Sequence, residues 1–286
     1  MAPRMWRHSI LTGSATGGYP LSTPVSLPLP SEIYQLALHR TGGGQFRAYL
    51  GFTPASFDSL LAVIAQYLHA SELGVYRTFL HDRRRESFLR GRYIAKQVLL
   101  NYLREKNPRR IRLESGVFDH PLVVHSAPST PQISLSHTRG WAAGLAFSEA
   151  HPMGLDLEAI TSSSAETIHS QVTAHEIGLH RTLADDENTF YTRLWTIKEA
   201  LSKVLKTGLT TPFEVYQVET LRACDGYTVG TFRNFGQYKA LSFRWKNNLC
   251  SVILPRETYC VLPPTLVGGR PGPSEPHNRC HFGSDD

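Results

Sequence analysis

Apolar and polar positions repeat along the middle of the chain with more than one period. Glu32–His39 alternates in part between apolar and polar residues, which predicts a short strand. Over Asp82–Leu103 the apolar residues can share one helical face while basic residues crowd the first half, which predicts a long helix. Asn188–Leu205 predicts a second long helix that ends near Gly208.

A β-hairpin is predicted between these two helices. Ser134 and Ser136 alternate with apolar residues along Ile133–His137, and Ala142–Phe147 follows after a Thr-Arg-Gly turn. Met153–Glu158 then predicts another strand. Strands therefore occupy the centre of the chain, with a long helix before and after them.

Two capping signals predict the starts of further helices. Thr53 is a predicted N-cap, with Pro54 in the first helical position. Thr173 and Glu176 fit a capping box, which predicts a helix that begins there. The C-terminal part is otherwise rich in β-forming stretches, namely Phe213–Glu219, Gly230–Arg233, Ala240–Trp245 and Cys250–Leu254.

The order of these elements predicts an α+β protein made of two similar halves. We expect an N-terminal half over 32–152 and a C-terminal half over 153–262. Residues 1–31 contain no acidic residue and five prolines, and 263–286 contain five prolines and four glycines. Because such compositions resist packing, we expect both ends to be flexible tails.

The charge of the chain points to an anionic partner. Its 286 residues carry 30 Lys+Arg against 24 Asp+Glu, a formal net charge of +6. This balance admits nucleic acid, a membrane surface, phosphorylated metabolites or an acidic protein. No apolar run approaches the length of a membrane span, and no secretory signal follows Arg4 and Arg7, so we expect a cytoplasmic protein that does not enter a membrane.

Two carboxylates two positions apart provide the first candidate chemistry. In a strand, Asp156 and Glu158 would project from the same face. They would repel each other unless a cation lay between them, and Mg²⁺ takes oxygen ligands and substrate phosphates. The alternative is a solvent-facing pair of acids, which is common on sheets.

The second long helix carries a third carboxylate. Trp195, Glu199 and Lys203 lie four positions apart and share a helical face. They can form an aromatic anchor with a surface ion pair, which stabilises a helix by only about 0.3–0.5 kcal/mol. Alternatively, Glu199 is a functional carboxylate beside a phosphate-binding lysine.

Two further groups could hold a phosphate. Ser136 and His137 offer hydrogen-bond donors at the end of a predicted strand. On the first long helix, Arg85, Arg92 and Lys96 fall near one face, which is either a solvated basic surface or a site for an anion.

Taken together, these motifs resemble the signature of the 4'-phosphopantetheinyl transferases. The signature is Gly-(Ile/Val/Leu)-Asp-x-Glu and, about forty residues later, Trp-x-x-Lys-Glu-(Ala/Ser)-x-x-Lys, which match Gly154–Glu158 and Trp195–Lys203. The length of the chain resembles the two-half, monomeric surfactin-type branch of this family. The resemblance implies two α+β halves related by a pseudo-two-fold axis, with the active site at their interface.

The resemblance also implies an activity and its residues. The phosphopantetheine arm of coenzyme A would pass to a serine of an apo acyl or peptidyl carrier protein, with release of adenosine 3',5'-bisphosphate. The Mg²⁺ ligands would be Asp156, Glu158 and Glu199, with Glu199 also as the base. Coenzyme A would be held by Arg85, Arg92, Ser136, His137, Lys198 and Lys203, with Lys203 on the pyrophosphate.

One departure and two alternatives remain. Many relatives carry Gly-Lys-Pro ahead of the Ser-His pair, whereas this chain has no lysine in the corresponding stretch 116–121. The alternatives are a nucleic-acid-binding protein, favoured by the basic charge, and a relative that binds coenzyme A or carrier protein without catalysis. The four retained residues Asp156, Glu158, Glu199 and Lys203 argue against the latter, and no nucleic-acid-binding motif supports the former.

Overall fold

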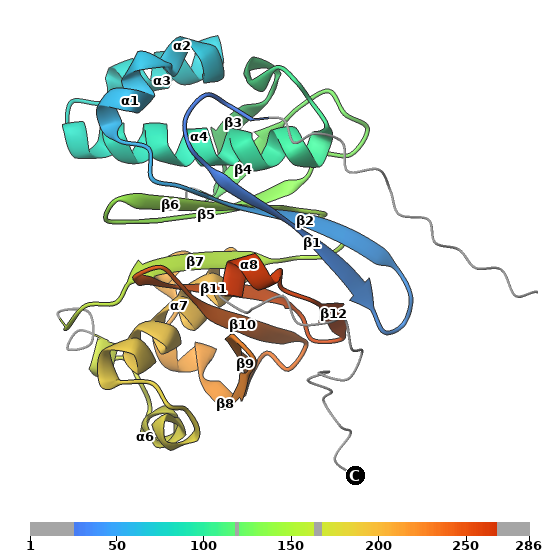
Figure 1. The fold of residues 1–286 in the computed structure, drawn as a ribbon, viewed down its shortest axis with the longest axis vertical. Coiled ribbons are helices and arrows are strands. Elements are labelled where there is room, and N and C mark those ends of the chain that lie inside the picture. Colours follow the sequence, from blue (N-terminus) through green and yellow to red (C-terminus); the bar gives the residue numbers. More distant parts are fainter. Residues whose placement is uncertain (1–25, 118–119, 163–167, 268–286) are drawn as a thin grey trace, which may run out of the picture.

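Two β-sheets lie face to face, and each carries a long helix on its outer face (Figure 1). The computed structural model describes residues 26–117, 120–162 and 168–267. Within them, helix and sheet are mixed, and the predicted α+β class is confirmed. From the top of Figure 1, the layers are helix, sheet, sheet and helix.

The first sheet has the order β12-β1-β2-β6-β5, with all neighbours antiparallel. Its strands are β1 (Glu32–Arg40), β2 (Gln45–Thr53), β5 (Gln132–Thr138), β6 (Trp141–Phe147) and β12 (Thr258–Cys260). The edge strand β12 comes from the far end of the chain and pairs with β1, so the C-terminal part completes the N-terminal sheet.

The second sheet has the order β7-β11-β10-β9-β8 and is also antiparallel. Its strands are β7 (Gly154–Ala159), β8 (Val218–Cys224), β9 (Tyr227–Phe232), β10 (Tyr238–Trp245) and β11 (Asn248–Pro255). A separate two-stranded ribbon consists of β3 (Arg112–Ser115) and β4 (Pro121–Val124). Strand β7 is an edge strand, and it lies beside β5 of the first sheet.

The two long helices cover the outer faces of the sheets. Helix α4 packs on β2 and β6, and α7 packs on β7 and β11. The α-helices are α1 (Phe57–Ala62), α2 (Ile64–Tyr67), α3 (Ala70–Thr78), α4 (Asp82–Leu103), α6 (Ala174–Gly178), α7 (Glu187–Leu205) and α8 (Pro264–Val267). Short 3-10 turns are η1 (Pro108–Arg110), η3 (Leu179–Thr182), η4 (Gly208–Thr210) and η5 (Phe213–Tyr216).

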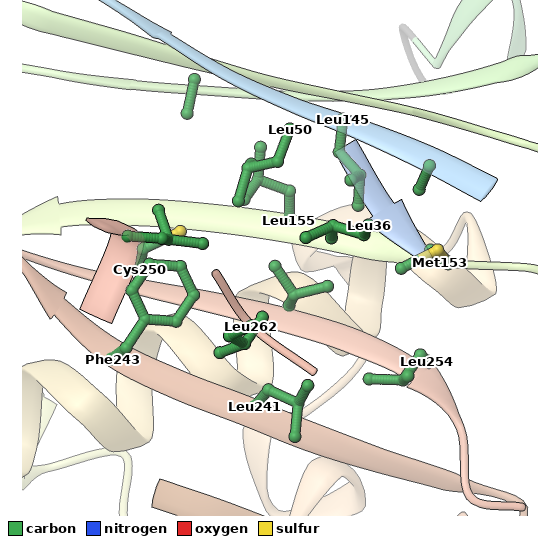
Figure 2. Close-up of a cluster of buried hydrophobic side chains, with 14 of the residues drawn as sticks. Leu36, Leu50, Leu145, Met153, Leu155, Leu241, Phe243, Cys250, Leu254 and Leu262 are labelled. Carbon is green, nitrogen blue, oxygen red and sulfur yellow. The ribbon is translucent and has the colours of Figure 1, made fainter. Parts of the chain in front are cut away.

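The largest core fills the space between the sheets (Figure 2). Leu36, Leu50 and Leu145 from the first sheet meet Leu155 and Phe243 from the second. Alternate residues of these strands point to this side, as the two-residue period of a strand requires. Two further cores lie between each sheet and its own helices.

Most of the predicted elements are confirmed. The first long helix has the predicted bounds, and the second begins one residue earlier, at Glu187. The hairpin is present as β5 and β6, and the Thr-Arg-Gly turn contains Gly140 at φ 79°. The capping box is formed, because Thr173 Oγ1 accepts from the Glu176 backbone N–H while the Glu176 side chain accepts from that of Thr173.

Several predicted boundaries differ from the structure, and two of them have a clear cause. Thr53 is the last residue of β2, paired with Ala142, and the helix begins at Phe57 with Ser56 as its N-cap. The strand expected from Phe213 begins only at Val218, because Phe213 stacks on Trp195 at 4.8 Å inside a 3-10 turn. In each case a tertiary contact overrides the local preference.

The expected tails enter the described structure only at their inner ends. Leu27 and Leu266 are buried in two different cores, at 8% and 2% exposure. The remaining residues of both tails lie outside the described ranges. The domain boundaries, the pseudo-two-fold relation and the monomeric state stay predictions.

A separate observation concerns membranes. Across the residues that the structure describes, no helix combines the length and apolar character needed to cross a bilayer.

Candidate active site

Strand β7 and helix α7 bring the predicted carboxylates together. Asp156 is 3% exposed on β7, and the half-buried Glu158 follows two residues later. Gly154 allows β7 and α7 to pack closely, since a Cβ at this position would collide with the backbone of Ala200 on α7. Glu199 therefore comes close enough to Asp156 for their charges to interact.

Lys203 and Ser136 both donate to Asp156 Oδ1. Lys203 Nζ lies 2.7 Å from this oxygen and also donates to the backbone oxygen of Leu155 at 3.0 Å. Ser136 Oγ, from β5 of the other sheet, donates to the same oxygen at 2.7 Å. The carboxylate thus lies where α7, β7 and β5 meet.

Hydroxyl side chains of β5 satisfy the free edge of β7. Ser134 Oγ accepts from the Leu155 N–H at 3.0 Å, and Ser136 Oγ accepts from Leu157 at 3.1 Å. Thr138 Oγ1 accepts from Ala159 at 3.2 Å, two residues further along. Because both strands have a two-residue period, the three bonds form a continuous row. Ser136, which is 8% exposed, therefore joins the two halves as well as orienting Asp156.

The three carboxyl groups of this cluster lie close together, and Lys203 offsets only part of their negative charge. Burial, then the charge of Asp156, raises the pKa of Glu158 to about 7. The same two causes raise the pKa of Glu199 to about 7, although Lys203 opposes them. Near neutral pH, each carboxyl can therefore exist in either form, as a proton-transferring group must.

The carboxylate oxygens of this cluster are suitable ligands for Mg²⁺. Asp156 Oδ2 is buried and has no hydrogen-bond partner. Within the described ranges, no three His, Cys, Asp or Glu side chains are grouped closely enough to enclose a metal ion. Mg²⁺ does not require such a cage, since it keeps several waters and uses one or two carboxylates together with substrate phosphates. Asp156 with Glu158 or Glu199 would supply these ligands.

A cleft of about 790 Å³ opens beside the carboxylates. Glu199 and Lys203 line it from α7, and His137 lines it from β5. Arg84 and Arg92 line it from α4. Helix α7 thus gives the cleft a carboxylate and a lysine, and α4 gives it two guanidinium groups. The carboxyl side chains of Glu72, Glu114 and Glu149 also line it.

His137 is held as a neutral donor and acceptor. Its Nε2 lies 3.2 Å from Ser87 Oγ of α4. Partial desolvation, then the charges of Lys203 and Arg90, lowers the pKa of His137 below its ordinary value. A neutral imidazole can still donate one hydrogen bond to a phosphate oxygen.

The structure does not bring Lys198 into the cleft. Lys198 is 1% exposed, and its Nζ lies 2.8 Å from Glu176 Oε2. Burial lowers its pKa, while the charge of Glu176 opposes this effect. Lys96, which the sequence placed on the basic face of α4, is likewise buried, 2.6 Å from Glu72 Oε2. Both lysines hold the fold together instead of facing a ligand.

The two predicted arginines differ in position. Arg92 lines the cleft, but its guanidinium also contacts Glu72 at 3.3 Å and lies over the ring of Phe88. Arg85 lies outside the lining of the cleft and over the ring of Tyr76.

Sequence reasoning missed several residues of the cleft. Arg84 is the member of the arginine triplet that faces it, and Ser87 follows one turn later. Lys206 and His120 line it near β5. The helical spacing of Arg84, Ser87 and Arg92 could have indicated that they share a face of α4. No sequence pattern near His120 predicts that it lines the cleft.

The fold and cleft thus define an α+β protein with a carboxylate and lysine site where its two sheets meet. Residues 152–253, which include β7 and α7, match the model of the 4'-phosphopantetheinyl transferase superfamily. The resemblance seen in the sequence is therefore confirmed for this part of the chain at the level of the superfamily, while the surfactin-type branch stays a prediction. No match to the chain was found among curated proteins.

Proposed function

We propose that this protein transfers the phosphopantetheine arm of coenzyme A to a serine of apo acyl or peptidyl carrier proteins, in a Mg²⁺-dependent reaction. The superfamily match supports phosphopantetheinyl transfer in general. The observation that carries the finer proposal is the meeting of Asp156, Glu199 and Lys203 beside one cleft.

The reaction breaks a pyrophosphate bond and forms a bond from the serine oxygen to phosphorus. Lys203 Nζ offers positive charge to the phosphate that leaves, because it reaches the cleft while bonded to Asp156. Glu199 accepts the proton of the carrier serine, because its carboxylate lines the cleft on the same wall as Lys203. Bound Mg²⁺ would neutralise charge on the pyrophosphate.

The opposite wall suits the remaining phosphate of coenzyme A. Arg84 is exposed in the cleft, and His137 and Ser87 offer neutral donors beside it. Charge-assisted hydrogen bonds from guanidinium groups to phosphate are among the stronger ones. The carrier protein would approach from the open side of the same cleft.

Mass spectrometry of the acceptor provides the test. The protein is mixed with coenzyme A, Mg²⁺ and an apo carrier domain, and a gain of one phosphopantetheine arm on the carrier is expected. A carrier whose acceptor serine is replaced by alanine is the control. No gain on several acyl and peptidyl carriers would contradict the proposal and favour a binding protein without catalysis.

Three of the basic residues are taken up in buried ion pairs. Lys96 and Lys198 are buried in ion pairs, and Arg193 is 6% exposed and paired with Asp185 at 2.7 Å. Each pair also contains an acid, so the three pairs leave the net charge of +6 unchanged. What favours a phosphorylated substrate over nucleic acid is the superfamily match. A cytoplasmic location stays a prediction.

A further inference from the structure

Two buried lysine–glutamate pairs are built in the same way in the two halves. Glu72 Oε2 accepts from Lys96 Nζ at 2.6 Å and from the backbone N–H that caps α3, while Oε1 accepts from Leu113 of β3. Glu176 Oε2 accepts from Lys198 Nζ at 2.8 Å and from the N–H that caps α6, and Oε1 accepts from Val218 of β8. The repeat supports the predicted relation between the halves.

This repeat shows which residues of the first half correspond to Glu199 and Lys203, the two residues of α7 that we call the catalytic wall. Glu199 follows Lys198 on α7, and Gln97 follows Lys96 at the same place on α4. Lys203 lies five residues after its lysine, where α4 has Asn101. The counterpart therefore carries two neutral amides instead of a carboxylate and an ammonium group.

The strands agree with this correspondence. A Cβ on Gly154 would meet Ala200, two residues after Lys198, and a Cβ on Gly51 would meet Val98, two residues after Lys96. Two residues beyond each glycine, β7 has Asp156 and β2 has Thr53. The first half thus has no carboxylate at this position of its strand.

Residues 27–30 lie on this counterpart site. The Leu27 N–H donates to Gln97 Oε1 at 2.9 Å, and Thr53 Oγ1 donates to the Pro30 oxygen at 2.9 Å. Between them, the Leu29 N–H donates to Tyr93 Oη at 2.7 Å, and Tyr93 Oη donates to the Leu29 oxygen at 3.0 Å. Leu27 is buried in the core beneath α4.

Each backbone N–H group of this segment has a hydrogen-bond acceptor on α4. The segment is Leu-Pro-Leu-Pro, and proline has no N–H. Its N–H groups are therefore only those of Leu27 and Leu29, and both have an acceptor on α4. A buried backbone donor without a partner is destabilising, so a segment with further N–H groups in this place would fit less well. Gln97 and Tyr93, at 2% and 0% exposure, serve these bonds from inside the structure.

We propose that the first half carries a peptide-recognition site, derived from the counterpart of the catalytic wall, whose ligand is the chain's own Leu27–Pro30. The neutral side chains Gln97 and Thr53 bind peptide groups where the second half has Glu199 and Asp156 for charged ligands. Residues 27–30 are consequently a structural strap and not part of a flexible tail. The proposal does not depend on the transfer activity.

Amide hydrogen exchange in the full-length protein tests whether the strap is seated. The Leu27 and Leu29 amides should exchange at least about 100-fold more slowly than unprotected amides. In Tyr93→Phe, Leu29 should lose most of this protection, while amides of α7 keep theirs. Tyr49→Phe is the matched control, because its hydroxyl bonds the exposed Gln35 side chain instead. Unprotected Leu27 and Leu29 amides in the wild type would overturn the proposal.

Peptide binding in trans tests recognition. In the full-length chain, the strap is replaced by Leu27→Gly, Pro28→Ser, Leu29→Gly and Pro30→Ser, and a labelled peptide of residues 25–32 is titrated while its fluorescence anisotropy is followed. Saturable binding is expected to this variant and none to the wild type, whose site is filled. A control peptide with both leucines changed to serine should not bind.

Three outcomes contradict the proposal. They are no binding to a variant whose circular dichroism is that of the wild type, equal binding of the control peptide, and equal binding to the wild type. If the replaced variant does not fold, the exchange measurement on the wild type and on Tyr93→Phe decides.

Discussion

Lys203 Nζ lies 2.7 Å from Asp156 Oδ1 and thereby ties the last turn of α7 to β7. The ion pair engages only one oxygen of the carboxylate, and the buried Oδ2 is left without a partner. Lys203 is 28% exposed, so the same ammonium also reaches the cleft. This one contact therefore holds an ammonium group at the cleft while one oxygen of the carboxylate keeps no hydrogen bond.

Replacing the proposed base should remove transfer and retain the fold. In Glu199→Gln, kcat should fall by about 10²-fold or more, because the side chain can no longer accept a proton. The rate is measured by mass spectrometry of the carrier, and the fold by circular dichroism. Glu187→Gln, an exposed change in the first turn of the same helix, is the control. Full activity of Glu199→Gln would contradict the assignment of the base.

The raised pKa values predict a pH-dependent stability of the metal-free protein. Glu158 and Glu199 have folded pKa values of about 7 against an ordinary 4.5, so the folded state holds their protons more tightly than the unfolded state. Their stabilising contribution is complete below pH 4.5 and is lost as the pH rises through 7.

Melting temperatures with and without these carboxyls measure this effect. Both proteins are melted in EDTA, and the Tm of the double variant Glu158→Gln/Glu199→Gln is subtracted from that of the wild type. This difference should decrease as the pH rises from 4.5 to 7.5. Subtraction removes the histidines, whose titration acts in the opposite direction. Added Mg²⁺ should raise the wild-type Tm at pH 7.5 and leave that of the double variant unchanged. A difference that is constant with pH would contradict the raised pKa values.

Lys198 should prove to be a structural residue. Lys198→Met leaves the carboxylate of Glu176 buried without its partner, and breaking such a pair costs about 3–5 kcal/mol of unfolding free energy. Urea denaturation measures the loss. Lys198→Met/Glu176→Gln should recover part of it, while the KM for coenzyme A stays near the wild-type value in both. A KM that rises tenfold in the double variant would instead place Lys198 at the substrate.

Arg84 and Arg85 should differ in their effect on coenzyme A. Arg84→Ala should raise the KM for coenzyme A by roughly tenfold or more, as expected for loss of a hydrogen bond from a charged group worth about 1.5–3 kcal/mol. Arg85→Ala should have a smaller effect, because Arg85 lies over Tyr76 outside the cleft lining. The reverse order would show that the sequence had selected the correct arginine.

Local patterns predicted much of the fold because their causes are local. The apolar period of Asp82–Leu103 and the Thr173–Glu176 capping box depend on residues within one or two turns. The boundary at Thr53 was wrong because its hydroxyl bonds Pro30, more than twenty residues away, while its backbone pairs with β6. No pattern within a few residues contains that information.

The candidate site divides in the same way. The sequence by itself determined that Glu199 and Lys203 share a face of α7 and that Asp156 and Glu158 share a face of β7, because the periods of a helix and a strand fix which residues lie together. Only the tertiary structure decided that Lys198 is buried against Glu176, although it precedes Glu199 directly. Neighbours on a helix point about 100° apart, so the surfaces that cover each of them come from distant segments of the chain.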